Sequence, residues 1–250
     1  MTRRLLDAFG LAAGGLCSVV GAGGKTSLLR ALAAQARESG LRVLLTTTTH
    51  MGMMPPEVSG TVFMDSEGVD EAALRRALDE DGRATLLGRR LREDKVQGVA
   101  PGRVDALRPL ADLVLVEADG ARQRSLKLPA EHEPVVPSLS TLMVVVSGLD
   151  AVTAPLDEGL VHRLELVRAA LGRAGGVVGE DGVAACLVHP AGYPGRVPAG
   201  ARLAAFLNKM EDAAAAQAAS RIAGRLAPPY ALVVGGSARA GVGQVLSCQP

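Results

Sequence analysis

The sequence has almost no net charge, few cysteines and no long apolar run. Its 27 basic and 26 acidic side chains leave a formal net charge of +1 over 250 residues. Nucleic-acid backbones require a concentrated basic surface, so this balance argues against nucleic acid as the partner. Basic residues do gather between Arg89 and Lys95, but Glu93 and Asp94 interrupt them, which indicates a solvated face or loop.

The cysteines and the apolar runs indicate the compartment. Cys17, Cys186 and Cys248 are scattered and odd in number, which fits a reducing cytosol better than a disulfide framework. No apolar run approaches the roughly 20 residues that a membrane-spanning helix needs. Asp7 interrupts the N-terminal apolar stretch, which argues against an export signal. We expect a soluble, cytoplasmic protein that does not act at a membrane.

Short apolar runs alternate with helix-like stretches along the chain. The runs are continuous, as in parallel strands that are covered on both faces. The alternation predicts a three-layer, doubly wound α/β fold with a mostly parallel sheet, and the length suits one domain over residues 1–250. The less regular segment 82–110 could form an inserted hairpin or a lid. We expect strands at Leu16–Val20, Arg42–Thr46, Leu113–Glu117, Leu142–Val146, Leu203–Leu207 and Ala231–Val234, and helices at Lys25–Ser39, Asp70–Asp79, Asp157–Gly172, Glu180–Val188 and Asp212–Leu226.

A glycine-rich loop follows the first predicted strand and leads into an amphipathic helix. Glycines allow several backbone N–H groups to face an anion, and the helix N-terminus adds its positive end. The lysine would reach the outer phosphates of ATP or GTP, and the threonine hydroxyl would help to coordinate Mg²⁺. The predicted nucleotide-binding loop of this P-loop NTPase-like fold comprises Gly21, Ala22, Gly23, Gly24, Lys25, Thr26 and Ser27.

The loop departs from the common pattern G-x-x-x-x-G-K-[ST], because only two residues separate Gly21 from Gly24. The shorter form G-x-x-G-K-T resembles the loop of the Mur ligases and folylpolyglutamate synthetases. The alternative is a simple glycine turn beside an incidental Lys-Thr pair. The register of strand, glycines, Lys-Thr and helix favours nucleotide binding.

Polar residues follow two other predicted strands. Glu117 and Asp119 end the run Leu113–Glu117 and share one face of an extended chain, so either could bind Mg²⁺ or orient a water molecule, or both could cap a turn. The threonines after Arg42–Thr46, including Thr47 and Thr48, either contact nucleotide or Mg²⁺ or simply continue the strand. In open α/β sheets, ligands bind at these carboxyl ends.

Two further segments are candidates for binding. The proline-bounded segment Lys127–Pro134, with Glu131 and His132, has the composition of a functional loop, although a solvated surface loop is the alternative. Asn208, Lys209 and Glu211 resemble the N-K-x-D turn that recognises guanine, with Glu in place of Asp. The alternative is the acidic start of a helix.

Five segments form a characteristic set in this order: VVGAGGKTSLL, LLTTTTHM, VEADGARQRSLKLPAEHEPVVP, SGLDAVTAPLDEGLVHR and FLNKMED. Together they resemble the YqeC family, which is named as a selenium-dependent hydroxylase accessory or selenium cofactor biosynthesis protein. The resemblance extends from about Leu5 to Val234. It implies a P-loop NTPase that helps to mature selenium-dependent molybdenum hydroxylases, with that client enzyme or its cofactor as partner. It also marks Lys127, Glu131, His132, His162 and Arg163 as characteristic positions without an assigned role.

Three functions are compatible with these residues. The first is an NTP-hydrolysing accessory protein for a molybdenum–selenium cofactor, with Lys25, Glu117 and Asp119 as the catalytic candidates. The second is a small-molecule kinase or ATP-dependent ligase, which the Mur-like loop suggests, with an acceptor near Lys127–Glu133. The third is a non-catalytic nucleotide-binding scaffold, because no arginine finger can be assigned from the sequence.

Overall fold

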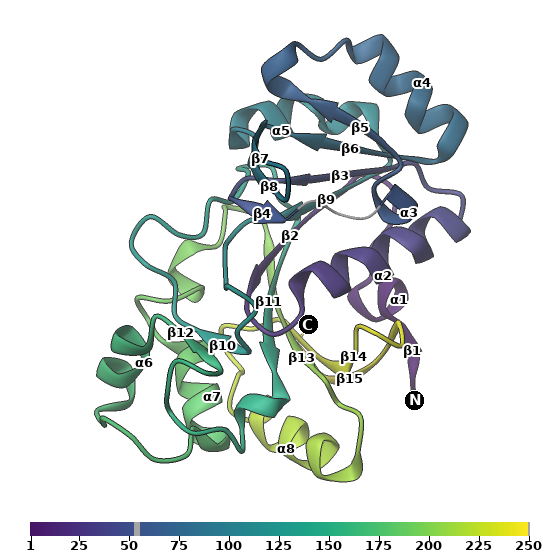
Figure 1. Cartoon of the computed structure of the whole chain (residues 1–250). Coiled ribbons are helices and arrows are strands. Elements are labelled where there is room, and N and C mark those ends of the chain that lie inside the picture. The colour runs from purple at the N-terminus through teal and green to yellow at the C-terminus, as the bar shows by residue number, and fades with distance from the viewer. Residues whose placement is uncertain (53–55, 250) are drawn as a thin grey trace.

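The computed structural model describes residues 1–52 and 56–249. In these residues ten strands form one sheet in the order β1-β15-β14-β13-β11-β2-β9-β3-β6-β5. The strands from β14 to β5 are parallel, and β15 and β1 close one edge in antiparallel orientation. This arrangement confirms the predicted mostly parallel α/β sheet (Figure 1).

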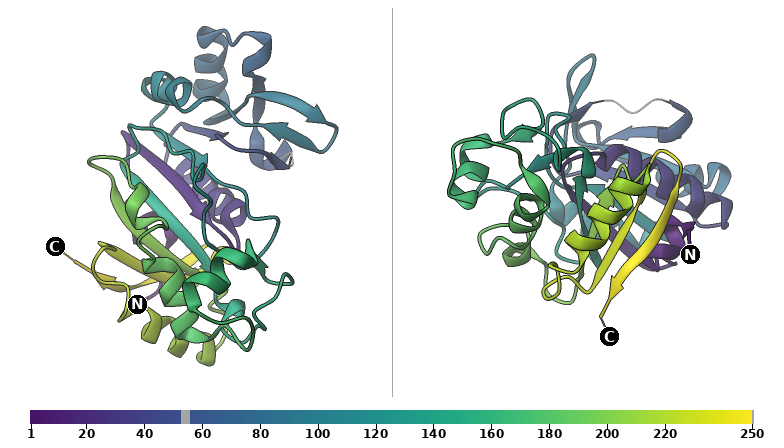
Figure 2. Two further views of the ribbon diagram at one scale, coloured as in Figure 1. Left: turned by 90° about the vertical axis from the view of Figure 1, so that its left-hand side faces the viewer. Right: turned by 90° about the horizontal axis from the view of Figure 1, so that it is seen from below.

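Two apolar cores lie on the two faces of the sheet, because the buried strands carry apolar side chains in both directions. On β2, Leu16 and Val20 belong to one core and Cys17 and Val19 to the other. Helices α1 and α2 pack on one face, and α4 to α8 on the other (Figures 1 and 2). The protein therefore has the three layers that the sequence predicts.

The predicted helix Asp157–Gly172 is wrong in its first half. Residues Val161–His162 form the short strand β12, which pairs in parallel with β10, and the helix α6 begins only at Leu164. The backbone N–H groups of Ser125 and Leu126 both donate to the Leu160 carbonyl. This pairing with a distant strand replaces the local helical preference.

The segment 82–110 contributes to two sheets. Its first strand, β6, lies in the main sheet between β3 and β5. Strands β7 and β8 then form an antiparallel hairpin, and β4 pairs with the second strand of that hairpin. The segment ends in α5 and a short 3-10 helix. Besides the predicted strands, the main sheet contains β5 at one edge with β6 beside it, and β15 and β1 at the other edge.

In the described residues, no helix combines the length and the apolar character that a membrane crossing requires. The helices are α1 (Leu5–Phe9), α2 (Lys25–Glu38), α3 (Pro56–Ser59), α4 (Glu71–Asp81), α5 (Pro101–Leu107), α6 (Leu164–Leu171), α7 (Gly179–Val188) and α8 (Ala213–Ala223), with 3-10 helices at Asp65–Glu67, Arg108–Leu110, Leu149–Ala151 and Pro194–Arg196. The strands are β1 (Arg3–Arg4), β2 (Gly15–Gly21), β3 (Val43–Thr47), β4 (Met51–Gly52), β5 (Thr61–Met64), β6 (Arg83–Leu87), β7 (Arg89–Arg92), β8 (Lys95–Gln97), β9 (Leu113–Glu117), β10 (Leu126–Lys127), β11 (Leu142–Gly148), β12 (Val161–His162), β13 (Arg202–Asn208), β14 (Leu232–Ser237) and β15 (Val242–Cys248).

Candidate functional site

The glycine loop connects β2, in the middle of the sheet, to the N-terminus of α2. Gly23 and Gly24 have φ values of +86° and +124°, which favour glycine. A Cβ atom at Gly23 would collide with the backbone of Gly148, and one at Gly24 with the amide of Asn208. The loop therefore needs glycine both for its backbone conformation and for its close packing against the ends of β11 and β13.

The backbone N–H groups of the glycine loop donate to protein oxygens, whereas the N–H groups at the start of α2 receive no side-chain cap within the described part of the chain. Protein oxygens accept hydrogen bonds from the N–H groups of Gly21, Ala22 and Gly23 at 3.0, 2.9 and 2.7 Å. Helix α2 begins after Gly24, and no side chain of the described residues caps it. The N–H groups of a first helical turn have no partner within the helix. This end of α2 is therefore open to an anion.

Lys25 is the first residue of α2, and its side chain is only 5% exposed. Its ammonium group donates to the Gly21 carbonyl at 2.8 Å and lies 3.2 Å from Asp119 Oδ1 and 4.0 Å from Glu117 Oε1. The lysine thus folds back over the loop and pairs with the acidic end of β9. The order of the strands brings these residues together, because β9 is the direct neighbour of β2.

Thr26 and Glu117 form an oxygen-rich pair beside Lys25. The Thr26 hydroxyl donates to Glu117 Oε2 at 2.9 Å. Burial raises the pKa of Glu117, although the Lys25 charge and the Thr26 hydrogen bond partly oppose this effect. A hydroxyl and a carboxylate next to a helix N-terminus are a donor set that suits Mg²⁺ together with phosphate oxygens.

Asp119 is fully buried and connects the glycine loop with a second group of charges. Its Oδ2 accepts hydrogen bonds from the Gly21 N–H at 3.0 Å and the Tyr193 hydroxyl at 2.8 Å, and lies 3.1 Å from Lys127 Nζ. Its Oδ1 has Lys25 as an ionic neighbour but receives no hydrogen bond from the described residues. Tyr193 is missing from the sequence predictions, since nothing local marks this tyrosine as a partner of Asp119.

Thr47 and Thr48 stand at the end of β3, on the other side of β9. The Thr47 hydroxyl donates to the Glu117 carbonyl at 2.9 Å, and the Thr48 hydroxyl donates to the Val135 carbonyl at 2.5 Å. Both hydroxyls therefore tie β3 to neighbouring backbone. The Thr47 hydroxyl holds the backbone at Glu117, and the Thr48 hydroxyl holds the loop at Val135.

Lys127, Glu133 and Arg163 form the second group of charges. Glu133 Oε2 lies 3.0 Å from Lys127 Nζ, and Glu133 Oε1 lies 3.1 Å from Arg163 Nη2. Burial disfavours the Glu133 carboxylate, but the hydrogen bonds and charges of Arg163 and Lys127 outweigh it and lower its pKa from 4.5 to about 2. The folded state therefore favours the ionised form of Glu133.

This pairing predicts a pH dependence of stability. A lowered pKa in the folded state stabilises the protein above about pH 4.5, and the contribution disappears as the pH falls toward about 2. At about 1.4 kcal/mol for each pH unit in this interval, roughly 3 kcal/mol is an upper limit. We expect Glu133→Gln to lower the free energy of unfolding at neutral pH and to flatten its decrease in acid, as measured by urea unfolding over a pH series.

Glu131→Gln is the matched control, because Glu131 lies two positions away on the same loop and is exposed. It should leave both the free energy at neutral pH and the acid slope unchanged. An acid slope in Glu133→Gln equal to that of the unchanged protein would show that this carboxylate does not contribute.

The remaining loop candidates lie around these charges. Glu131 and His132 are exposed, and Arg196 holds their loop by donating to the carbonyls of Ala130, Glu131 and Glu133. His162 stands opposite Lys127 in the pairing of β10 and β12. Burial and the charges of Lys127 and Arg163 lower the pKa of His162. His162 therefore lies next to the group formed by Lys127, Glu133 and Arg163, whereas Glu131 and His132 face solvent.

The predicted base-recognition turn lies at the end of β13, next to the glycine loop. The Asn208 amide donates to the Gly23 carbonyl at 2.7 Å and accepts from the Ala238 N–H at 2.8 Å. Lys209 Nζ lies 2.6 Å from Asp150 Oδ2. The Glu211 side chain is exposed, and its Oε1 accepts a hydrogen bond from the Ser237 hydroxyl at 3.3 Å. Asn208 thus braces the loop, whereas Glu211 still faces solvent.

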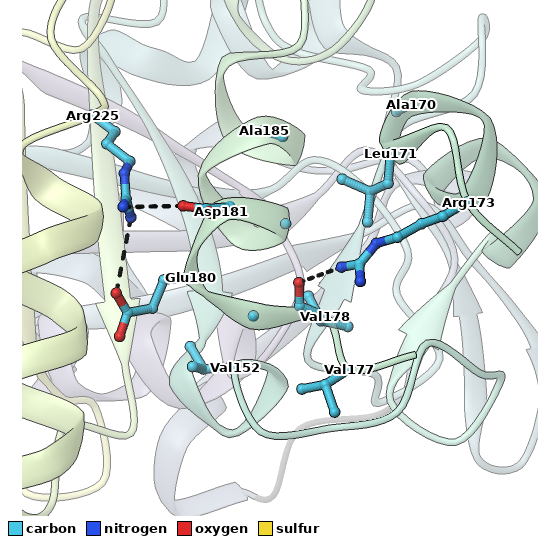
Figure 3. A pocket seen from close by; sticks show the side chains of 12 residues that line it. Val152, Ala170, Leu171, Arg173, Val177, Val178, Glu180, Asp181, Ala185 and Arg225 are labelled. Carbon is cyan, nitrogen blue, oxygen red and sulfur yellow. Dashed lines mark hydrogen bonds and ion pairs between the residues drawn. The ribbon is translucent and has the colours of Figure 1, made fainter. Parts of the chain in front are cut away.

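A cavity of about 700 Å³ opens elsewhere, between α6, α7 and the segment after β11 (Figure 3). Its charged side chains are already paired. Arg225 lies 3.0 Å from Asp181 and 3.8 Å from Glu180, and Arg173 donates to the Val178 carbonyl at 2.6 Å. Of the described residues that line it, none belongs to the loops after β2 or β9. We therefore place the candidate site at the glycine loop.

Comparison with known proteins adds a family match. The model of the YqeC protein family matches residues 17–165. The "Uncharacterized protein YqeC" of Escherichia coli (strain K12) is 37% identical over 209 residues, which cover 82% of this chain and 80% of the relative. Among solved structures, FtsY from Mycoplasma mycoides is similar with 14% identity and a TM-score of 0.42; the match covers 88% of this chain and 59% of that one. The family match includes the glycine loop, Asp119 and the Lys127 cluster.

Proposed function

Because this chain belongs to the YqeC family, we propose that it is a magnesium-dependent P-loop NTPase that binds ATP or GTP. The observation that carries the proposal is one arrangement of three groups. The open N-terminus of α2, the Lys25 ammonium and the Thr26–Glu117 pair converge at the carboxyl ends of β2 and β9. In α/β sheets this edge is where phosphates bind. The whole chain is, in this proposal, one nucleotide-binding domain that carries the β7–β8 hairpin as an insertion.

The residues present fit Mg²⁺. Thr26 and Glu117 supply a hydroxyl and a carboxylate that already touch at 2.9 Å, and Asp119 keeps one buried oxygen that receives no hydrogen bond from the described residues. Hard cations of this kind prefer such oxygen ligands and complete their shell with phosphates and water. Bound Mg²⁺ would neutralise charge that develops on the phosphates. Thr26 and Glu117 would coordinate the ion, and the Asp119 carboxylate would lie next to them.

Lys25 changes partner when a nucleotide binds. In the structure its charge faces Asp119, and its hydrogen bond goes to the Gly21 carbonyl. We expect the terminal phosphates to draw the ammonium away from both. Asp119 can release it because Lys127, the Tyr193 hydroxyl and the Gly21 N–H continue to stabilise its negative charge. The lysine then places a positive charge where the phosphates accumulate negative charge.

Base recognition falls to the turn after β13. Asn208 positions the loop against the segment after β14 and uses both polar groups of its amide for this purpose. The exposed Glu211 carboxylate is an acceptor that suits the N–H groups of guanine, and the neighbouring Lys209 is held by Asp150 and Ser125. In this proposal Asn208 holds the loop, and Glu211 with the stem of Lys209 contacts the purine. The choice between ATP and GTP belongs to the experiment below.

The cellular role follows from the family resemblance. We propose that hydrolysis in the cytoplasm supports the maturation of selenium-dependent molybdenum hydroxylases, with the client enzyme or its cofactor as partner. A second candidate is a small-molecule kinase or ligase. The observation that favours it is the Lys127–Glu133–Arg163 cluster, which adjoins the predicted phosphate site through Asp119.

The test is calorimetric titration with Mg-ATP and with Mg-GTP, followed by a phosphate-release assay on the same samples. We expect saturable binding of one of them and slow release that a client hydroxylase accelerates. Release that depends on a small acceptor instead would favour the kinase or ligase. Binding without release under either condition would indicate a scaffold. If neither nucleotide binds, the proposal is wrong.

A further inference from the structure

Asp119 is a fully buried carboxylate whose two oxygen atoms have different surroundings. Its Oδ2 accepts hydrogen bonds from the Gly21 N–H at 3.0 Å and the Tyr193 hydroxyl at 2.8 Å, and lies 3.1 Å from Lys127 Nζ. Its Oδ1 lies 3.2 Å from the Lys25 ammonium but receives no hydrogen bond from the described residues. Buried acceptors without a hydrogen bond are rare, and they commonly mark a functional group or the place of an ion.

Oδ1 lies on the side of Asp119 where Mg²⁺ is expected. Lys25 Nζ is 3.2 Å from Asp119 Oδ1 and 4.0 Å from Glu117 Oε1, and the other oxygen of Glu117 accepts the Thr26 hydroxyl. The free oxygen of Asp119 therefore adjoins the Thr26–Glu117 pair. Movement of Lys25 to a bound phosphate would take away a cation that now neutralises Oδ1.

Tyr193 is the donor to Oδ2 that serves Asp119 alone. Lys127 is shared with Glu133, which lies 3.0 Å from the same ammonium group. Among the described residues, by contrast, the Tyr193 hydroxyl has no hydrogen-bond partner other than Asp119. Tyr193 comes from the loop after α7, which contains none of the residues that the sequence marks for the site.

The Tyr193 ring has a fixed position. Its side chain is 1% exposed and belongs to the core on the α4–α8 face of the sheet. The adjacent backbone is also held, because the Gly192 N–H donates to the His189 carbonyl at 2.8 Å and the Arg196 N–H to the Tyr193 carbonyl at 3.0 Å. Burial, with the charge and hydrogen bond of Asp119, raises the pKa of Tyr193 well above its usual value. The hydroxyl therefore keeps its proton at neutral pH and donates to the carboxylate.

We propose that Tyr193 is a positioning residue of the phosphate site, which fixes Asp119 through Oδ2 and thereby leaves Oδ1 available to Mg²⁺ or to one of its water ligands. The inference rests on the proposed NTPase and adds to it a residue from a distant loop. Partners that orient a group beside a metal ion affect metal affinity about 10- to 100-fold. Loss of the Tyr193 hydroxyl should therefore weaken the dependence of this site on Mg²⁺ more than its fold.

Tyr230 provides a closely matched control. It is the other tyrosine of the chain, it is also 1% exposed, and its hydroxyl donates to the Leu187 carbonyl at 2.8 Å. Tyr193→Phe and Tyr230→Phe each remove one buried hydroxyl and one hydrogen bond, but only the first changes a partner of Asp119. We expect Tyr193→Phe to raise the Mg²⁺ concentration for half-maximal nucleotide binding about tenfold or more, as measured by equilibrium dialysis. Tyr230→Phe should leave it unchanged.

A second measurement observes the tyrosine itself. The chain has two tyrosines and no tryptophan, so labelling at ¹³Cζ gives two NMR signals, which the two Phe variants assign. We expect Mg²⁺ together with the nucleotide to shift the Tyr193 signal saturably and to leave the Tyr230 signal in place. Should Tyr193→Phe fail to fold in thermal unfolding, the Tyr230→Phe protein, with Tyr193 as its single tyrosine, still provides this test.

The outcomes separate this inference from the NTPase proposal. If the unchanged protein binds nucleotide but both Phe variants have the same Mg²⁺ midpoint, or if the Tyr193 signal does not respond, Tyr193 has only a structural role and the NTPase proposal stands. If the unchanged protein binds neither Mg-ATP nor Mg-GTP, both proposals are wrong. A raised midpoint in Tyr193→Phe alone, with a saturable shift of its signal, supports the positioning role.

Discussion

Lys25→Ala is expected to abolish nucleotide binding. The lysine is buried at the start of α2, and a phosphate group that replaced Asp119 as its partner would face a largely desolvated charge. Removal of one partner from such a pair costs about 2–5 kcal/mol, so we expect a loss of affinity of roughly 100-fold or more. Calorimetric titration with the nucleotide that binds the unchanged protein gives the answer directly.

Two controls keep this result interpretable. Arg30→Ala removes a positive charge from the exposed side of the same helix and should leave the affinity unchanged. Thermal unfolding shows whether Lys25→Ala still folds; Asp119 retains Lys127, Tyr193 and the Gly21 N–H as partners, so we expect a folded protein. Unchanged affinity in a folded variant would contradict the assignment of the loop to nucleotide.

The glycine loop and the acidic strand end can be predicted because each is a local pattern. A buried strand followed by glycines, Lys25 and an amphipathic helix specifies one strand–loop–helix unit. Parallel strands end at the same edge of a sheet, so the sequence alone predicts that Glu117 lies near the loop. The structure places its carboxylate 2.9 Å from the Thr26 hydroxyl.

Contacts between distant segments cannot be predicted in the same way. Tyr193 is 74 positions away from Asp119, and no periodicity or motif connects the two. The predicted helix that includes Val161–His162 follows local preference, whereas pairing with β10 makes this segment a strand. Because that pairing brings His162 and Arg163 beside Lys127, the error concerns the part of the chain that forms the second group of charges.

The turn at Asn208 illustrates how a motif can be found while the contacts of its residues remain hidden. The sequence suggests that the Asn208 side chain contacts a nucleotide base. In the structure its amide joins the Gly23 carbonyl to the Ala238 N–H, so both polar groups bind protein. Only the packing of three strand ends determines this arrangement, and sequence spacing does not contain it.

Glu117→Gln is expected to separate binding from turnover. The substitution keeps the shape of the side chain and an oxygen for the Thr26 hydroxyl, so the fold should persist. It removes the negative charge that would hold Mg²⁺ or orient water. We expect phosphate release to fall by roughly 100-fold or more, while nucleotide affinity changes much less, because such groups act mainly in the transition state. Phosphate release at a series of Mg²⁺ concentrations measures the effect.

Burial makes this test more stringent. The pKa of Glu117 is raised by burial, so neutral glutamine should fit the site with little loss of stability, unlike a replacement of the doubly paired Asp119. Glu80→Gln, an exposed acid on α4, is the control and should release phosphate at the normal rate. If the Glu117→Gln variant also releases phosphate at the normal rate, the Thr26–Glu117 hydrogen bond has only a structural role and joins the start of α2 to the end of β9. The Mg²⁺ ligands would then have to be sought among Thr26, Asp119 and the nucleotide itself.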